Sequence, residues 1–186
     1  ILEFPGLNVL DLSTFPEAPE VQETADTYAG NALLKAQAIA AHTGLPALAD
    51  DSGLEVDALG GAPGVKSARF AGAQTGFELK LPKLLECLAN VPEEKRTARF
   101  RCVLCWVNPQ ANLESPFFTE GLVEGHIAHE PRGQHGFGYD PVFVPQGFQR
   151  TMAELEPHQK DALSHRGRAL QKMLTFLQER GVENPT

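Results

Sequence analysis

The sequence predicts an α/β fold in which a β-sheet is flanked by helices. Residues 28–42 are rich in alanine and leucine, a composition typical of helices. Residues 99–107 and 117–128 are rich in the β-branched and aromatic residues that favour strands. A final helix is expected over about 166–180, where apolar residues recur at helical spacing: Leu170, Met173, Leu174 and Leu177. Helices and strands mixed along one chain indicate a sheet covered by helices.

The first helix is expected to run from Tyr28 to His42. Thr24 or Asp26 can cap its start, and Gly44 lies just beyond its end. After this helix we expect two short strands separated by a turn, at 45–49 and 54–59.

The middle of the chain is expected to hold a helix over 79–88 and then a hairpin. Pro82 must lie near the start of that helix or kink it, because proline has no amide N–H to donate. The hairpin turn is expected at 109–112, and its second strand is expected to break at Gly121 and Gly125.

The C-terminal part begins with a glycine-rich loop over 133–145. Thr151 and Glu154 then have the spacing of a capping box. Ser164 can cap the last helix, and Gly181 ends it.

Composition limits the classes of partner. The chain has 186 residues and a net charge of -8, which argues against a nucleic-acid-binding surface because phosphate backbones attract basic proteins. It does not argue against a nucleotide substrate, since a metal ion supplies positive charge locally. No apolar run approaches the roughly 18 residues of a membrane span, so no membrane partner is expected.

The cysteines Cys87, Cys102 and Cys105 form no disulfide framework, which fits a reducing, cytoplasmic location. Cys102 and Cys105 lie three residues apart in an expected strand, so they point to opposite faces. We therefore interpret them as small buried hydrophobic residues rather than as a redox or zinc pair.

Two adjacent carboxylates, Asp50 and Asp51, follow an apolar run at the point where a turn is expected. Adjacent acids repel each other, and a divalent cation with oxygen ligands is their natural partner. Glu23, just before the first helix, is a third carboxylate that can join this site or orient water as a general base. The alternative interpretation is an acid at a helix start plus an ordinary turn.

Thr27, Asn31 and Lys35 fall at intervals of four residues, so they share one face of the first helix. Lys35 can bind phosphate from that face. A solvated polar face is the alternative.

Two further segments suit a nucleobase. His165 and Arg166 place cations in the first turn of a helix, where cations are mildly unfavourable, so a ligand rich in carbonyl acceptors can recruit them. Phe137, between two glycines, can stack on a base. The alternatives are solvated cations and an ordinary hairpin loop. His126 and His129 have no ligand partner at useful spacing, so no metal site is expected there.

Taken together and in order, these segments resemble the inosine triphosphate pyrophosphatase family, which acts on non-canonical purine nucleotides. The matching segments are Glu23-Thr24, Thr27, Asn31-Ala32, Lys35, Ala49-Asp50-Asp51-Ser52-Gly53-Leu54, Gly60-Gly61-Ala62-Pro63-Gly64, Ser67-Ala68-Arg69, Phe137-Gly138-Tyr139-Asp140-Pro141, Lys160 and Ser164-His165-Arg166-Gly167. The resemblance implies one bilobed domain over 1–186, with a long, curved, mixed sheet flanked by helices and a central cleft between two lobes. It also implies a homodimer.

The activity that the resemblance implies is hydrolysis of ITP, dITP and XTP to the monophosphate and pyrophosphate. Water attacks the α-phosphorus with Mg²⁺, or Mn²⁺, bound. Asp51 is implied as the general base. The implied metal ligands are Glu23, Asp50 and Asp51, and the implied phosphate ligands are Lys35 and Ser52. The implied base-binding residues are Phe137, Gly138, Tyr139, Asp140, Lys160, His165 and Arg166.

The chain departs from the family pattern in two places. It begins with Ile1-Leu2-Glu3-Phe4-Pro5, so the family's N-terminal strand and Thr-Gly-Asn-x-x-Lys phosphate loop are expected to be missing from this sequence. The segment 75–82 carries Gly76 and Pro82 where the family has a regular helix. Two alternatives stay open: a Maf-like nucleotide pyrophosphatase of other specificity, and a nucleotide-binding protein without turnover.

Overall fold

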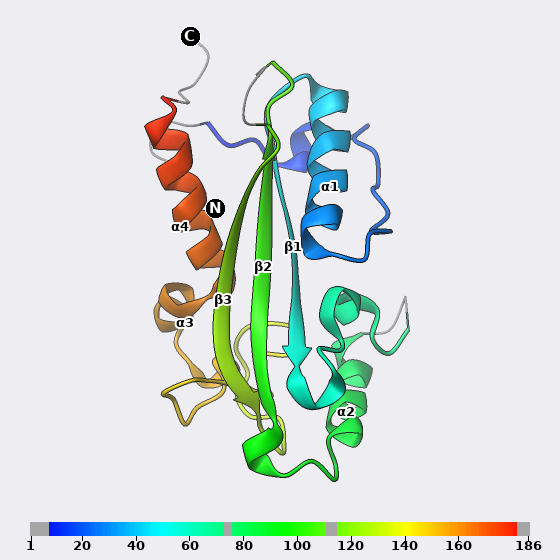
Figure 1. The fold of residues 1–186 in the computed structure, drawn as a ribbon, viewed down its shortest axis with the longest axis vertical. Coiled ribbons are helices and arrows are strands. Elements are labelled where there is room, and N and C mark those ends of the chain that lie inside the picture. Colours follow the sequence, from blue (N-terminus) through cyan, green and yellow to red (C-terminus); the bar gives the residue numbers. More distant parts are fainter. Residues whose placement is uncertain (1–7, 73–75, 111–114, 182–186) are drawn as a thin grey trace. The chain divides into compact units, whose positions relative to one another are not determined.

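The computed structural model describes residues 8–72, 76–110 and 115–181. Its helices and strands are α1 (Tyr28–Thr43), β1 (Ala47–Val56), α2 (Phe77–Cys87), β2 (Thr97–Val107), β3 (Phe117–Ile127), β4 (Phe143–Pro145), α3 (Pro157–Leu163) and α4 (His165–Glu179). Short 3-10 helices lie at Leu12–Thr14, Asp57–Leu59, Gly64–Arg69, Glu93–Lys95 and Met152–Glu154. The predicted fold class, a sheet flanked by helices, is confirmed (Figure 1).

The strands form one sheet in the order β1-β2-β3-β4, so each strand pairs with its neighbour along the chain. β3 and β4 are antiparallel, with Gly125 opposite Pro145 and Ile127 opposite Phe143. A Cβ atom at Gly125 would lie 2.2 Å from the carbonyl oxygen of Val144. Glycine at this position therefore allows β4 to approach closely. The predicted break of the strand at Gly121 and Gly125 is wrong, because β3 is continuous over Phe117–Ile127.

The chain divides into two compact units. Unit 1 comprises residues 1–51, 103–120 and 169–186, and unit 2 comprises 52–102 and 121–168. None of the helices in the described residues has the length and apolar content to cross a membrane.

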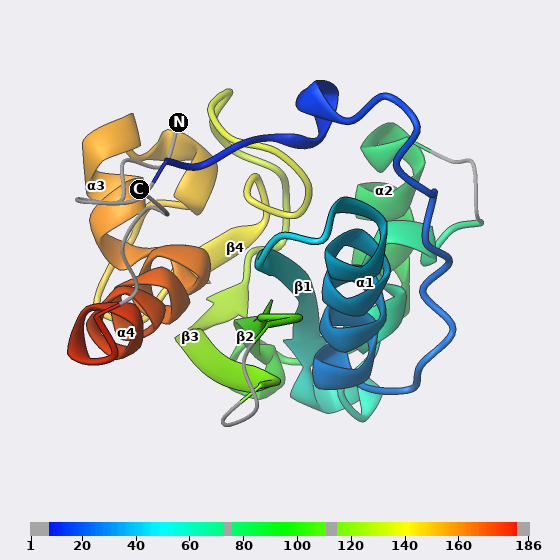
Figure 2. The same cartoon turned by 90° about the horizontal axis from the view of Figure 1, so that it is seen from above.

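In unit 1 the sheet lies between α1 and α4 (Figure 2). Ala32 and Ala36 of α1 form a buried cluster with Cys105 of β2. On the other face, the ring of Phe176 in α4 contacts Trp106 of β2 and stacks on Phe117 of β3. Because alanine projects only a methyl group, α1 packs close to the sheet.

The core of unit 2 is a cluster of buried aliphatic and aromatic side chains on β1, α2, β2, β3 and β4. It includes Leu54, Val56, Leu84, Leu88, Phe100, Val123, Ile127, Val142, Phe143, Met152 and Leu155. The rings of Phe100 and Phe143 lie 4.4 Å apart at its centre.

Arg96 is fully buried in the same unit. Its guanidinium group donates to three backbone carbonyls: Leu88 at 2.8 Å, Ile127 at 2.8 Å and Ala128 at 2.9 Å. Burial lowers the pKa of Arg96 from its usual value. This side chain joins the end of α2 to the end of β3.

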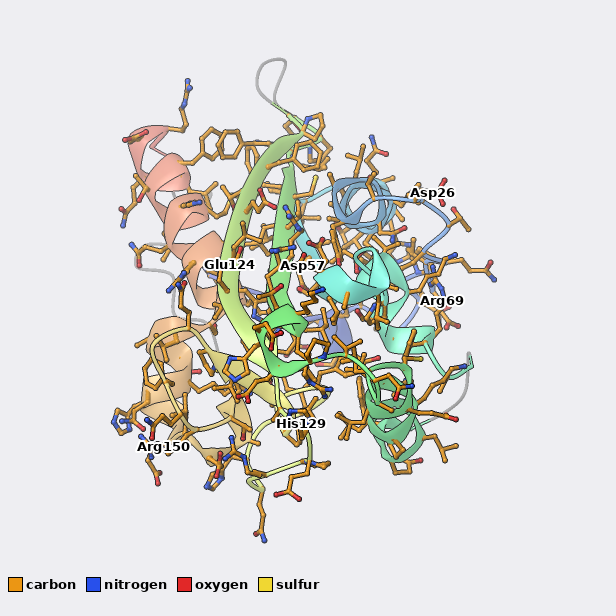
Figure 3. The ribbon with its side chains drawn as sticks, turned by 60° about the horizontal axis from the view of Figure 1, so that its bottom comes forward. Asp26, Asp57, Arg69, Glu124, His129 and Arg150 are labelled. Atoms are coloured by element: carbon orange, nitrogen blue, oxygen red, sulfur yellow. The ribbon has the colours of Figure 1, made fainter. Side chains whose placement is uncertain are left out.

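Three charged side chains on the surface of unit 2 form ion pairs with one another. Arg99 of β2 lies 2.9 Å from Asp57 and 3.0 Å from Glu124, which Figure 3 shows near one another. A hydrogen bond from Thr97 and the Arg99 guanidinium lower the pKa of Asp57. The group borders a pocket of about 460 Å³. We interpret it as a surface ion-pair network.

The structure corrects the expected boundaries around the acidic pair. One strand, β1, replaces the two expected strands, and Asp50 and Asp51 lie inside it rather than in a turn. The reason is tertiary, because Asp51 gains a hydrogen-bond donor from α1 that a turn does not offer.

Helix ends are corrected in three places. Thr27 caps α1, rather than Thr24 or Asp26. Pro82 lies inside α2, because α2 begins earlier than expected. The sequence analysis missed α3, which Glu156 and Gln159 cap reciprocally.

Other local predictions are confirmed. Gly44 ends α1, and Thr151 and Glu154 form a capping box. Ser164 caps α4 by accepting a hydrogen bond from the Gly167 N–H at 2.9 Å. The expected turn at 109–112 lies partly outside the described residues.

Candidate active site

The polar face of α1 is buried against β1. Asn31 is fully buried, and its amide group donates to Asp51 Oδ2 at 2.9 Å. Its oxygen accepts from the Ala25 N–H at 2.9 Å, which ties down the segment before the helix. The interpretation of this face as solvated is therefore wrong for Asn31.

Two carboxylates converge on Lys35. Its Nζ lies 2.7 Å from Glu23 Oε1 and 4.0 Å from Asp51 Oδ1. The side chains of Lys35 and Glu23 are about a quarter exposed, whereas Asp51 is nearly buried. Solvent therefore reaches a cation position that is surrounded by carboxylate oxygens.

Strand geometry separates Asp50 and Ser52 from this group. Successive side chains of a strand point to opposite faces, so Asp50 and Ser52 lie on the face of β1 opposite Asp51. The structure brings Glu23 and Asp51 together and does not bring Asp50 to them. Within the described residues, no three His, Cys, Asp or Glu side chains are arranged to hold a metal ion.

In unit 2, Asp140 organises the glycine-rich loop. It is nearly buried, and its Oδ2 accepts from the Phe137 N–H at 2.9 Å and from Lys160 Nζ at 2.6 Å. A Cβ atom on Gly136 would lie 2.2 Å from the same oxygen. With a φ of +80°, this position requires glycine on both steric and conformational grounds.

The ring of Phe137 lies at the surface of this loop and is 64% exposed. Lys160 Nζ lies 4.9 Å and Arg166 Cζ lies 6.0 Å from the ring centroid. An exposed aromatic face beside two cations suits a planar ligand that carries oxygen acceptors.

Tyr139 and His165, two predicted base-binding residues, lie deeper. Tyr139 is buried, its hydroxyl donates to the Ser67 carbonyl at 3.0 Å, and burial raises its pKa. Only its backbone is available to a ligand. The His165 ring stacks on Phe100 at 4.9 Å.

Ser67 is a framework residue whose role the sequence analysis missed. Its Oγ donates to the Gly64 carbonyl at 2.6 Å and accepts from the Leu54 N–H at 2.9 Å. Together with the bond from Tyr139, these contacts join β1, the 3-10 helix Gly64–Arg69 and the loop. The Ser67-Ala68-Arg69 motif was the available signal.

The cysteine interpretation is confirmed. Cys102 and Cys105 are buried and form no disulfide. Burial raises the pKa of Cys105 to about 12, so this residue stays a neutral thiol. His126 and His129 border a pocket of about 210 Å³ together with Glu93, Glu130 and Arg132.

Comparison with known proteins gives the family. The Ham1 family model matches residues 1–176. A dITP/XTP pyrophosphatase from Yersinia pseudotuberculosis is 52% identical over 158 residues, which cover 85% of this chain and 80% of that protein. Another from Desulforamulus reducens is 48% identical over 172 residues, 92% of this chain and 84% of its own length. The Staphylococcus aureus Ham1 structure has a TM-score of 0.88 at 39% identity, covering 95% of this chain and 90% of that one. These matches span most of the sequence and agree with the resemblance, so the chain belongs to the Ham1 family.

Proposed function

We propose that this protein hydrolyses ITP, dITP and XTP to the monophosphate and pyrophosphate. The observation that carries the proposal is the nearly buried Asp51 carboxylate, which Asn31 orients beside Lys35. Its relatives from Yersinia pseudotuberculosis and Desulforamulus reducens are named dITP/XTP pyrophosphatases, and these names do not favour the Maf-like alternative.

The residues around Asp51 and Lys35 carry out the reaction at phosphorus, and the glycine-rich loop of unit 2 binds the base. Asp51 accepts a proton from the attacking water, because Asn31 fixes its carboxylate beside the partly exposed Lys35. Lys35 contacts phosphate oxygens, whereas the phosphate role of Ser52, which lies on the opposite face of β1, stays a prediction from the family resemblance. Such positioned charges are the main source of catalysis in reactions at phosphorus.

We also propose Mg²⁺, or Mn²⁺, as the cofactor. Glu23 and Asp51 supply hard oxygen ligands around one cation position, which fits these ions when waters and phosphates complete the coordination. When bound, the metal supplies charge neutralisation at the triphosphate. The metal role of Asp50, which lies on the opposite face of β1, stays a prediction from the family resemblance.

Replacing Lys35 with methionine is expected to tighten Mn²⁺ binding to the nucleotide-free protein by about tenfold, because a positive charge leaves the cation position. The same variant should bind nucleotide more weakly. Calorimetric titration measures both affinities, and Lys172→Met, on α4, is the matched control. Unchanged Mn²⁺ affinity would remove Glu23 and Asp51 from the proposed metal site.

Base recognition is assigned to the loop of unit 2. Phe137 stacks on the base, and Lys160 and Arg166 present hydrogen-bond donors to the edge of the base. Hypoxanthine and xanthine carry a keto acceptor where adenine carries an amino donor. Donors such as Arg166 therefore favour the keto bases, since adenine leaves them unpaired.

Replacing Arg166 with alanine is expected to reduce the ratio of kcat/KM for ITP to that for ATP by about 10–150-fold, the value of a charge-assisted hydrogen bond. Steady-state pyrophosphate release with both substrates measures this ratio. Arg168→Ala removes a cation from the same turn of α4, one that donates to the Leu122 carbonyl, and should leave the ratio unchanged. Equal losses on ITP and ATP would place Arg166 on the phosphates or in the fold.

The experiment that tests the function is pyrophosphate release from dITP, ITP and XTP, with ATP and GTP for comparison. Faster release from dITP, ITP and XTP than from ATP is expected, because adenine alone among these bases carries an amino group in place of the keto group. Binding without turnover would support the non-enzymatic alternative instead. A homodimer and a cytoplasmic location are also proposed from the family resemblance, and light scattering tests the dimer.

A further inference from the structure

A phenylalanine at the start of α2 packs against the back of the base-binding loop. The ring of Phe77 meets the ring of Tyr139 edge-on, with centroids 5.4 Å apart and planes at 90°. A Cβ atom built on Gly138 would lie 3.4 Å from Phe77 Cε1, an ordinary van der Waals distance. Phe77 therefore contacts Tyr139 and borders the space beside Gly138 that a side chain there would enter.

Lys80 fixes this ring from the next turn of α2. Its Nζ lies 4.5 Å from the Phe77 centroid, and the residue is only 5% exposed. Across residues 8–72, 76–110 and 115–181, Lys80 forms no ion pair with a carboxylate. A buried ammonium group needs electrostatic compensation, which the face of an aromatic ring supplies.

The loop is held at two further points. Tyr139 is anchored through its hydroxyl to Ser67, and Asp140 is anchored by Lys160 and by the Phe137 N–H. Gly138 lies between these anchored residues with a φ of +68°, and as a glycine it packs no side chain of its own. Phe77 fills the space against that residue.

We propose that Phe77 and Lys80 are positioning residues that set the orientation of Phe137 and hence the affinity for the purine base. The proposal rests on the proposed function, because it takes this loop as the base site. Phe77 contacts the loop through Tyr139, and Lys80 acts on the loop through the Phe77 ring.

Replacing Phe77 with leucine is expected to raise KM for dITP and XTP by about 2–12-fold, the range that corresponds to an aromatic pair, while kcat changes less than twofold. Phe77→Tyr should restore the normal KM because it keeps the ring. Lys80→Met should raise KM in the same direction, and Lys80→Arg should restore it.

The matched control is Phe70→Leu. Phe70 forms the same kind of pair with Lys83 of α2, at 5.6 Å, and it likewise packs on the core of unit 2. Among the described residues, the ring of Phe77 pairs with that of Tyr139, and the ring of Phe70 does not. We expect it to lower stability without changing KM.

Hydrogen–deuterium exchange separates this inference from the proposed function. Phe77→Leu should speed exchange of the Phe137 N–H, which donates a hydrogen bond to Asp140. Phe70→Leu should leave this exchange rate unchanged. Wild-type protein without turnover on dITP would refute the function, and the exchange data would still test the positioning. Unchanged exchange and KM in Phe77→Leu, equal effects in Phe70→Leu, or a fall in kcat at constant KM would each overturn the inference.

Discussion

Replacing Asp51 with asparagine is expected to lower kcat by about 10²–10⁴-fold, the usual loss when a general base is removed. Asparagine matches aspartate in shape but does not accept a proton from water at neutral pH. The side-chain oxygen still accepts from Asn31, so the hydrogen bond that joins α1 to β1 persists. Single-turnover measurement of pyrophosphate release from dITP gives the chemical rate.

Asp26→Asn is the matched control, since it makes the same chemical change on an exposed carboxylate just before α1 (Figure 3). Its rate should equal that of the wild type. A near-normal kcat in Asp51→Asn would show that Asp51 is not the general base. Glu23, the other carboxylate beside Lys35, would then be the candidate for that role.

Replacing Arg96 with methionine is expected to lower the free energy of unfolding by about 3–5 kcal/mol. Methionine fills much of the volume but donates nothing, so three buried carbonyls lose their donors, at about 1–3 kcal/mol each before relaxation. These carbonyls belong to Leu88, Ile127 and Ala128, at the ends of α2 and β3. Urea denaturation followed by circular dichroism measures the loss.

Arg150→Met controls for the loss of a surface arginine (Figure 3). It should change the free energy of unfolding by no more than about 0.5 kcal/mol, as is usual for exposed substitutions. If the free energy of unfolding of Arg96→Met fell by as little, the buried guanidinium would contribute no net stability, because its desolvation cost would offset its three hydrogen bonds.

Elements with strong local signals were predictable from the sequence. The alanine-rich segment gave α1, the apolar spacing of 166–180 gave α4, and Thr151 with Glu154 gave the capping box. The continuity of β1 was not predictable in this way. Asp-Asp-Ser-Gly has the composition of a turn, and the hydrogen bond from the distant Asn31 favours an extended Asp51.

The site was predictable in residue type more than in role. Phe137, Lys160 and Arg166 gather as expected, yet the neighbouring Tyr139 lies in the core. Residue type does not determine burial, so the sequence alone does not separate a ligand contact from its support. Phe77 was missed because its contact with Tyr139 is distant in sequence.

The small side chains under α1 have a consequence for how this protein tolerates change. Ala32 lies next to Asn31 in α1, and both Ala32 and Ala36 sit directly on Cys105 of β2. Larger side chains at these three positions would push α1 outward and stretch the 2.9 Å bond between Asn31 and Asp51. The need to keep this hydrogen bond short therefore limits the side-chain volume at Ala32, Ala36 and Cys105, although these buried residues contact neither water nor substrate.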